Sequence, residues 1–214
     1  MQLVIFDVDG TLVDSQATIV ACAQAAFAAE GLEVPSATAV RRIVGLTLPI
    51  AMSTLHGEPD SVRGERLAEH YREAFMEYRA RPDFAEPLFE GAREIIAELE
   101  QRQILLGVAT GKAMRGLRTV LERHGLEDRF VTLQTADLHP SKPHPAMVLA
   151  ALAETGVAPG RAMLVGDTSF DMEMAKAAGV RAVGVAWGNH PPAELLATGA
   201  DPVLQRFEEL LELL

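Results

Sequence analysis

The opening stretch, residues 1–11, constrains the fold of this chain more than any other. Residues 3–6 form an unbroken apolar run. Such a run is long enough for a strand buried on both faces of a parallel sheet and too short for a helix. Asp7 and Asp9 follow directly, and Gly10 permits a sharp turn. Because the carboxyl ends of parallel strands open into a ligand crevice, we expect two carboxylates to enter a functional site.

The second part of the chain alternates between helical and strand patterns. We expect helices at about 91–101, 113–124, 146–155 and 170–178, and a last helix from residue 206. Between them, short apolar runs predict strands at 104–109, 131–134, 162–165, 180–186 and 202–204. This alternation predicts an α/β fold with a doubly wound, mostly parallel sheet.

Residues 16–80 show helical periodicity only. Ser15 is expected to cap a first helix, a short helix is expected over 36–45, and Thr47 is expected to cap a third. Asp60 to Arg79 has the pattern of a long amphipathic helix. A run of helices between a first strand and a later strand series predicts an inserted all-helical cap at 16–80, with residues 1–15 and 81–214 forming the core.

Groups able to do chemistry fall at the ends of four predicted strands. Independent loops would scatter such groups over both edges of a sheet, whereas these all follow the carboxyl ends of strands. We therefore expect them to converge on one site, which comprises Asp7, Asp9, Thr110, Gly111, Lys142, Asp167 and Asp171.

Composition narrows the choice of partners. The net charge of −11, with 30 acidic against 19 basic residues, argues against a nucleic-acid partner, which requires clustered Lys and Arg. No apolar run approaches the ~20 residues that span a bilayer, and no basic segment precedes an apolar core at the start. We therefore expect a cytoplasmic protein without membrane contact, present as a monomer or homodimer. The one cysteine, Cys22, is expected to be buried and unreactive.

Four motifs together resemble those of the haloacid dehalogenase-like phosphohydrolases. The string Asp7-x-Asp9-Gly10-Thr11-Leu12-x-Asp14-Ser15 resembles the nucleophile motif of that family. The pair Thr110-Gly111 resembles the second motif, Lys142-Pro143-His144-Pro145 the third, and the segment from Gly166-Asp167 to Asp171 the fourth. The resemblance implies a Rossmann-like core with a helical cap, similar to the group that contains phosphoglycolate phosphatases and β-phosphoglucomutases.

The resemblance also implies a role for each residue. Asp7 would attack phosphorus and form an aspartyl-phosphate, and Asp9 would act as the acid and base. Thr110 and Gly111 would hold phosphate oxygens, and Lys142 would neutralise the transferring phosphoryl group. The implied cofactor is Mg²⁺, which Asp7 and Asp167 would bind through their side chains, Asp9 through its backbone carbonyl and Asp171 through a bound water.

Simpler readings compete with several of these roles. Asp171 could serve only as negative charge at a helix N-terminus, and Lys142 only as a loop lysine. Lys112, directly after Thr110-Gly111, competes with Lys142 for the same function. In the cap, Arg41, Arg42 and Thr47 are candidates to face the site, with an exposed helix face and a helix cap as their alternatives.

The expected activity is hydrolysis of a small organic phosphomonoester, with phosphoglycolate as the leading candidate. A phosphoryl-transfer isomerase of the β-phosphoglucomutase kind and an inorganic pyrophosphatase remain alternatives, because the core motifs do not separate them. Asp9 and Asp167 argue against a dehalogenase, because dehalogenases of this family lack the acid at the position of Asp9 and need no metal. A phosphate-sensing module without catalysis is the alternative from a different functional class.

Overall fold

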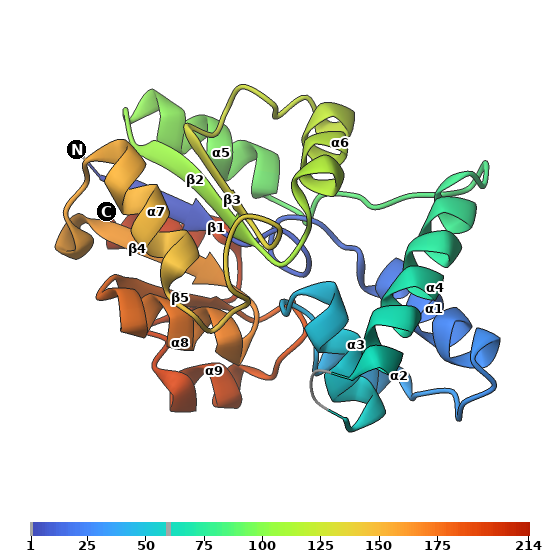
Figure 1. The fold of residues 1–214 in the computed structure, drawn as a ribbon. Coiled ribbons are helices and arrows are strands. Elements are labelled where there is room, and N and C mark those ends of the chain that lie inside the picture. The colour runs from blue at the N-terminus through green and yellow to red at the C-terminus, as the bar shows by residue number, and fades with distance from the viewer. Residues whose placement is uncertain (1, 59–60) are drawn as a thin grey trace.

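The computed structural model describes residues 2–58 and 61–214, so Met1 and Asp60, which fall within expected elements, lie outside the described residues. Six parallel strands form one sheet in the order β3-β2-β1-β4-β5-β6 (Figure 1). They are β1 (Leu3–Phe6), β2 (Leu105–Thr110), β3 (Thr132–Thr135), β4 (Ala162–Gly166), β5 (Arg181–Val185) and β6 (Val203–Leu204). Strands β2 and β3 are added on one side of β1, and strands β4 to β6 are added on the other side. At this change of direction, a crevice opens between the carboxyl ends of β1 and β4.

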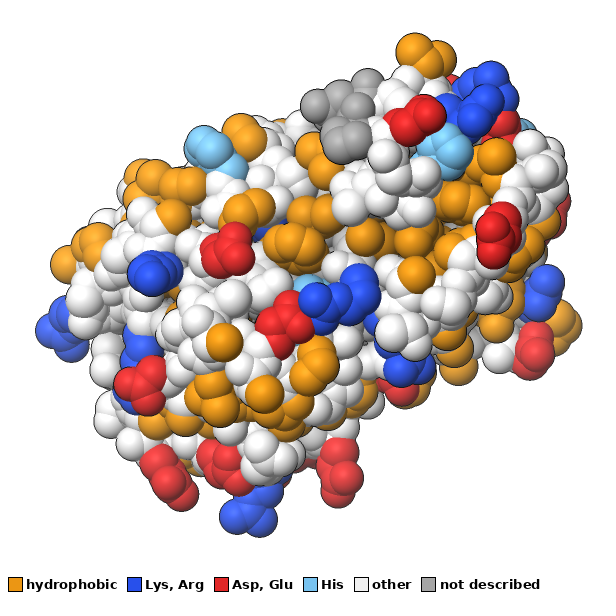
Figure 2. Space-filling view, turned by 90° about the horizontal axis from the view of Figure 1, so that it is seen from below, with side chains coloured by type: hydrophobic (Ala, Val, Ile, Leu, Met, Phe, Trp, Pro, Cys, Tyr) orange, Lys and Arg blue, Asp and Glu red, His pale blue; other side chains and the backbone are white. Residues whose placement is uncertain are grey.

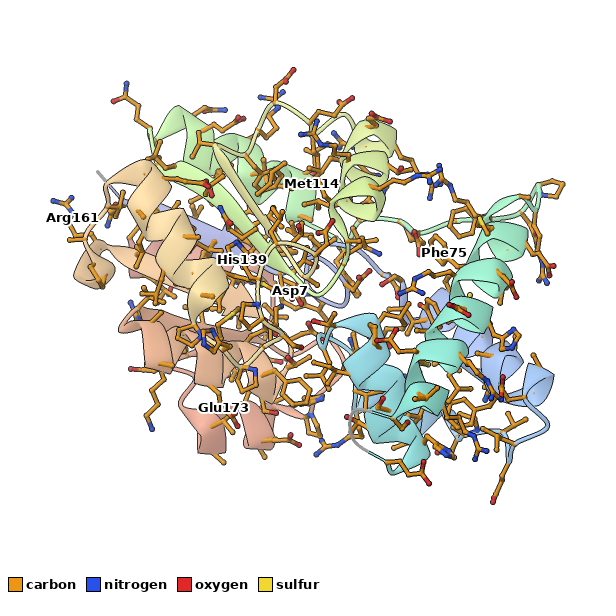
Figure 3. The ribbon with its side chains drawn as sticks, in the orientation of Figure 1. Asp7, Phe75, Met114, His139, Arg161 and Glu173 are labelled. Atoms are coloured by element: carbon orange, nitrogen blue, oxygen red, sulfur yellow. The ribbon has the colours of Figure 1, made fainter. Side chains whose placement is uncertain are left out.

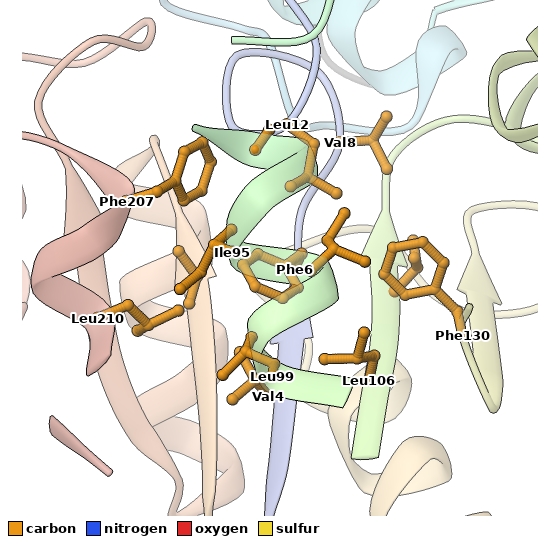
Figure 4. Packing of buried hydrophobic residues seen from close by; sticks show 14 of the residues in the cluster. Val4, Phe6, Val8, Leu12, Ile95, Leu99, Leu106, Phe130, Phe207 and Leu210 are labelled. Carbon is orange, nitrogen blue, oxygen red and sulfur yellow. The ribbon is translucent and has the colours of Figure 1, made fainter. Parts of the chain in front are cut away.

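Helices cover both faces of this sheet, which confirms the doubly wound α/β fold. The side chains of β1 alternate between the two layers, as the pleat requires. Val4 and Phe6 belong to the same apolar cluster as residues of α5 (Ala92–Gln101), α6 (Met114–His124) and the 3₁₀ helix η2 (Phe207–Leu213). Figure 4 shows Phe6 among residues of α5 and η2. Leu3 and Ile5 pack with α7 (Ala146–Thr155), α8 (Ser169–Ala178) and α9 (Pro192–Thr198). A single 3₁₀ turn, η1 (Pro159–Arg161), precedes β4.

In the described part of the chain, four helices lie between β1 and α5 in the sequence and to one side of the sheet in Figure 1. They are α1 (Gln16–Ala29), α2 (Ala37–Arg41), α3 (Leu48–His56) and α4 (Val62–Arg79). Their apolar faces meet in a separate cluster that includes Phe27, Val40, Met52 and Leu67. The described part of residues 16–80 contains helices and connecting turns but no strand.

Several element predictions were wrong in detail. The short helix expected over 36–45 ends at Arg41, and tight turns carry the chain to Gly45, which has φ +98°. Helix α9 was not predicted, because its seven residues bury only Leu195 and leave little periodicity to read. The last helix is 3₁₀ rather than α, since Phe207 and Leu210 are buried three residues apart, a spacing that places them on one side of a 3₁₀ helix.

Two predicted N-cap residues stand at the expected positions, but neither makes the capping hydrogen bond. Ser15 stands at the N-cap of α1, but its hydroxyl donates to Asp9 Oδ1 at 2.6 Å instead of bonding to the helix. Thr47 stands at the N-cap of α3, and its hydroxyl makes no capping bond either. The Ser15 hydroxyl is thus engaged with Asp9, whereas the Thr47 hydroxyl has no hydrogen-bond partner among the described residues.

Charged side chains are dispersed over the face of the molecule that Figure 2 shows. On the face shown in Figure 2, Lys and Arg side chains are scattered among acidic ones and do not gather into one patch. That face therefore lacks the basic stripe with which a protein follows a nucleic-acid backbone. Among the described residues, no helix combines the length and the apolar character needed to cross a bilayer.

Candidate active site

The carboxyl ends of four neighbouring strands bring the predicted site residues together. The Asp7 amide donates to the Val165 carbonyl at 2.9 Å, which places Asp7 directly beside the end of β4 and Asp167. Thr110 ends β2, and the loop after β3 carries Lys142 inward until it is fully buried. Figure 3 shows Asp7 near the centre of the molecule, between the sheet and the four N-terminal helices.

Lys142 lies between two buried carboxylates. Its ammonium nitrogen is 2.6 Å from Asp171 Oδ1 and 3.0 Å from Asp7 Oδ1. Burial alone would lower the pKa of Lys142, but the charges of Asp171 and Asp7 raise it above its usual range. The competing Lys112 instead lies 3.1 Å from Asp9 Oδ2. The fold therefore gives each lysine a different carboxylate, with Lys142 beside Asp7.

The Asp171 carboxylate belongs to the first turn of α8 as well as to this cluster. Its Oδ2 accepts the amide of Thr168 at 3.1 Å and the hydroxyl of Thr168 at 2.7 Å, which forms a capping box. Oδ2 of Asp171 thus caps the helix, as the simpler interpretation expects, whereas Oδ1 forms the ion pair with Lys142.

Asp167 is held by residues from two distant loops. Its Oδ1 accepts the hydroxyl of Thr11 at 3.0 Å, and its Oδ2 accepts the amide of Asn189 at 2.7 Å and the side-chain nitrogen of Asn189 at 2.8 Å. A side chain at Gly10 would not fit, since its Cβ would lie 2.3 Å from Asp167 Oδ2. Gly10, at φ +84°, therefore allows the first loop to approach Asp167 closely.

Burial and crowding of negative charge act on two of these acids. Burial raises the pKa of Asp7 to about 8, with Lys142 acting in the opposite direction and the charges of Asp171 and Asp167 adding to the rise. Burial also raises the pKa of Asp167 to about 7, again with a contribution from Asp171. A cation between these carboxylates would favour their charged forms.

The donor set fits a hard divalent metal ion. Asp7, Asp167 and Asp171 offer oxygens that lie within 4.8 Å of one another and are all buried. Both oxygens of Asp7 are without a hydrogen-bond partner among the described residues, although Lys142 provides an ion pair. Buried carboxylate oxygens without such partners are expected where a metal ion binds, and an all-oxygen set suits Mg²⁺.

Asp9 occupies a less buried position beside Asp7. Its Oδ1 accepts the Ser15 hydroxyl at 2.6 Å, and its Oδ2 faces Lys112. Burial would lower the pKa of Lys112, but Asp9 and Glu86 raise it. Contacts with Ser15 and Lys112 thus fix the orientation of the Asp9 carboxylate, and Asp9 also lines the cleft. A group in this position can exchange protons with a ligand in the cleft.

A cleft of about 590 Å³ leads away from this edge of the sheet. Asp7, Asp9, Thr110 and Gly111 form one end of it, and α3, α4 and α6 contribute its walls. Figure 3 shows Phe75, on α4, across from Asp7. The cleft therefore connects the acids to the four N-terminal helices.

Of the three cap candidates, the structure brings Thr47 to the cleft. Its amide donates to the Ser141 hydroxyl at 2.9 Å, so the loop before α3 contacts the loop that carries Lys142. Arg42 instead pairs with Glu194 outside the cleft, and Arg41 is exposed. For these two arginines the simpler reading as surface residues holds.

Other residues around the acids were not predicted. Glu86 lies in the segment between α4 and α5, is buried at the cleft, and has a raised pKa, mainly through burial. His190 is buried, and its Nδ1 accepts the amide of Ser169. Thr11 lies within the first of the four motifs, but Asn189 and Glu86 carry no sequence signal.

Comparison with known proteins agrees with this geometry. Residues 4–185 match the model of the haloacid dehalogenase-like hydrolase family. "Probable phosphatase IndB" from Dickeya dadantii is 35% identical over 98% of this chain and 91% of its own length. N-acetylmuramic acid 6-phosphate phosphatase from Pseudomonas aeruginosa is 30% identical over 100% of this chain and 95% of its own length.

A solved structure shows the same arrangement. A haloacid dehalogenase-like hydrolase from Bacteroides fragilis is 26% identical, covers 98% of this chain and 99% of its own, and superposes with a TM-score of 0.89. The chain belongs to the haloacid dehalogenase-like hydrolase family. The expectations of this family, and of an enzyme of its phosphatase class, are thereby confirmed.

Proposed function

We propose that this protein is a Mg²⁺-dependent phosphatase that hydrolyses a small organic phosphomonoester through an aspartyl-phosphate on Asp7. The observation that carries the proposal is the Asp7 carboxylate itself. It is buried, both of its oxygens are free of hydrogen bonds among the described residues, and it borders the cleft with Lys142 directly behind it. A free carboxylate beside a fixed cation can attack an anionic phosphoryl group that it would otherwise repel.

In the first half-reaction, an oxygen of Asp7 forms a bond to phosphorus while the bond from phosphorus to the ester oxygen breaks. Asp9 donates a proton to the departing oxygen, so the leaving group departs as an alcohol. Lys142 neutralises charge on the phosphoryl oxygens, and Thr110 and the Gly111 amide hold them in line.

In the second half-reaction, water attacks phosphorus, and the bond between phosphorus and Asp7 breaks. Asp9, now ionised, accepts the proton of the water, and inorganic phosphate leaves. The contacts from Ser15 and Lys112 hold the Asp9 carboxylate in place through both steps.

Mg²⁺ would be held by the side chains of Asp7 and Asp167 and the backbone carbonyl of Asp9, with Asp171 contributing through water. When bound, the ion neutralises the phosphate and the carboxylates that face it. Asp167 retains lone pairs for this purpose, because each carboxylate oxygen can accept more than one contact.

Residues 16–80 act in this proposal as a cap over the core formed by 1–15 and 81–214. The separate apolar cluster of α1–α4 and the position of the cleft between α3, α4 and α6 support this division. A cap that closes on the core excludes water from the site during transfer.

The test combines substitution with trapping of the intermediate. Asp7→Asn should abolish phosphate release from 2-phosphoglycolate and other phosphomonoesters, and acid quenching with phosphate-labelled substrate should label the wild-type protein only. Asp128→Asn, an exposed carboxylate on the surface, should behave as wild type. Substantial turnover by Asp7→Asn would overturn the assignment.

A second incubation separates hydrolysis from isomerisation. With Mg²⁺ and 2-phosphoglycolate, we expect release of inorganic phosphate. With β-glucose 1-phosphate and a bisphosphate primer, formation of glucose 6-phosphate without phosphate release would support an isomerase instead.

A further inference from the structure

The cleft beyond Asp7 is larger than a two-carbon leaving group needs. Its volume of about 590 Å³ lies within the range of ~300–1,000 Å³ found for sites that bind drug-sized ligands. Apolar side chains form much of the wall, including Ile43, Leu46 and Met52 from the segment around α2 and α3 and Tyr71 and Phe75 from α4. A ligand that fills this space must present an apolar body to these side chains.

Three arginines also line the cleft. Arg72 and Arg79 come from α4 and Arg115 from α6, so they stand on both sides of it. None of the three forms an ion pair within the described parts of the chain, although Arg79 is close enough to Glu86 to lower its pKa. All three side chains are exposed, and in a protein with a net charge of −11 they place positive charge around one cleft, which favours an anionic ligand there.

The other charged groups of the cleft already have partners. Lys112 faces Asp9, and Arg123 lies 3.7 Å from Glu86. Asp137 accepts bonds from the Thr135 hydroxyl and the Met114 amide. The positive charge available to a ligand therefore comes from Arg72, Arg79 and Arg115.

We propose that the substrate's leaving group carries an apolar body longer than glycolate and, at its far end, a second anionic group bound by Arg72, Arg79 and Arg115. The substrate class is thus a phosphorylated amphipathic acid. This inference rests on the proposed phosphatase function, since the phosphate end must reach Asp7. Arginine suits the far end because its planar guanidinium binds carboxylate or phosphate with two parallel bonds.

The arrangement also relates binding to closure of the cap. Arg72 and Arg79 lie on a helix of residues 16–80, whereas Arg115 lies on a helix of the α/β part. An anion shared between them attracts both walls, so the far end of the substrate would draw α4 towards α6. Binding energy from this remote group could then contribute to the reaction at Asp7.

The test uses matched alkyl phosphates. Straight-chain esters with two, four and six methylene groups are prepared in two forms, one ending in a carboxylate and the other in the neutral primary amide. We expect kcat/KM to favour the acid over the amide by about tenfold or more at the best chain length, the factor of one charge-assisted hydrogen bond. We also expect that length to exceed that of phosphoglycolate.

Variants identify the residues responsible. Arg115→Gln, Arg79→Gln and Arg72→Gln should each reduce kcat/KM for the acid more than kcat/KM for the amide, so that the preference for the acid falls. Arg118→Gln, an exposed arginine on α6 outside the cleft, is the matched control and should keep the preference. Equal rates for acid and amide in the wild type, or equal losses of both in the variants, would overturn the inference.

A binding measurement separates this inference from the proposed function. Phosphonate analogues of the acid and the amide, which cannot be hydrolysed, are titrated into the wild-type protein with Mg²⁺ by calorimetry. Failure to hydrolyse any ester would overturn the phosphatase proposal, whereas tighter binding of the acid phosphonate, lost in Arg115→Gln, would still support the anion site. A matched bisphosphate that binds better than the acid with the same arginine dependence identifies the second anion as phosphate.

Discussion

The ammonium of Lys142 lies 2.6 Å from Oδ1 of Asp171, and both side chains are fully buried. The other oxygen of Asp171 is held by the first turn of α8, and Lys142 also faces Asp7. The start of a helix therefore fixes an acid, the acid fixes a lysine, and the lysine stands beside the carboxylate proposed to attack phosphorus. In the proposed reaction, Asp171 would act by positioning Lys142.

We predict that Lys142→Met and Asp171→Asn each lower the free energy of unfolding by about 3 kcal/mol, because removal of one partner leaves buried charge without compensation. The double variant should lose less than the sum, since the two residues share one interaction. Urea unfolding measures all three. The exposed pair Arg102 and Glu98 provides the control, and Arg102→Met should cost less than about 1 kcal/mol. Additive losses in the double variant would contradict the coupling.

Stability should depend on pH in opposite ways with and without metal. The pKa of Asp7 is about 8 and that of Asp167 about 7, against an ordinary value of 3.8. A carboxyl with a raised pKa binds its proton more tightly in the folded protein than in the unfolded chain. This proton therefore contributes fully to folding stability below about pH 4, and the contribution is lost as the pH rises towards 8. In chelator, Tm should therefore fall over this range.

Mg²⁺ should reverse this trend. Because metal binding requires ionised carboxylates, the rise in Tm on adding Mg²⁺ should be larger at pH 8 than at pH 5.5. Thermal unfolding at matched ionic strength, with Ca²⁺-free buffers and chelator as the reference, measures the difference. The same increment at both pH values would show that these acids do not bind the ion, and Asp167→Asn should remove most of the increment.

Much of the fold could be predicted from the sequence because most strand residues are buried. Apolar runs such as residues 3–6 and the glycines that end several helices mark where elements begin and end. The errors lie where few side chains are buried. Helix α9 buries one residue and was not predicted, whereas η2 buries two and was predicted as a helix of the wrong type.

The sequence predicted that the site residues meet at the carboxyl edge of the sheet, but it did not show how their side chains pair. Lys142 pairs with Asp7 and Lys112 pairs with Asp9, and this pairing depends on the path of the two loops that carry the lysines. Asn189 contacts Asp167 from a loop 22 residues later, and no local pattern records such a contact. The chemical roles remain predictions that the substitutions above test.

A methyl group at Gly111 should separate the cap from the core. Its Cβ would lie 2.5 Å from the Gly45 carbonyl oxygen and 2.9 Å from that of Leu46, both backbone atoms of the loop before α3. We expect Gly111→Ala to displace this loop and to lower kcat/KM by about tenfold or more, since small displacements at an active site are costly. Gly160→Ala, which meets no atom within 4 Å, is the control and should keep wild-type kinetics. Wild-type kinetics in Gly111→Ala would show that the two loops separate during turnover.

The hydroxyl of Thr47 should contact the substrate. It is buried at the cleft without a hydrogen-bond partner among the described residues, while the Thr47 amide bonds to Ser141. A buried hydroxyl without a partner costs about 1–3 kcal/mol, so Thr47→Val, which keeps the shape, should stabilise the ligand-free protein by about 1 kcal/mol in urea unfolding. If the hydroxyl bonds to the leaving group, the same change raises KM several-fold, and Thr47→Ser restores it. Thr47→Val with an unchanged KM would mean that the hydroxyl meets no substrate atom, and a loss of stability would mean that it has a partner in the free protein.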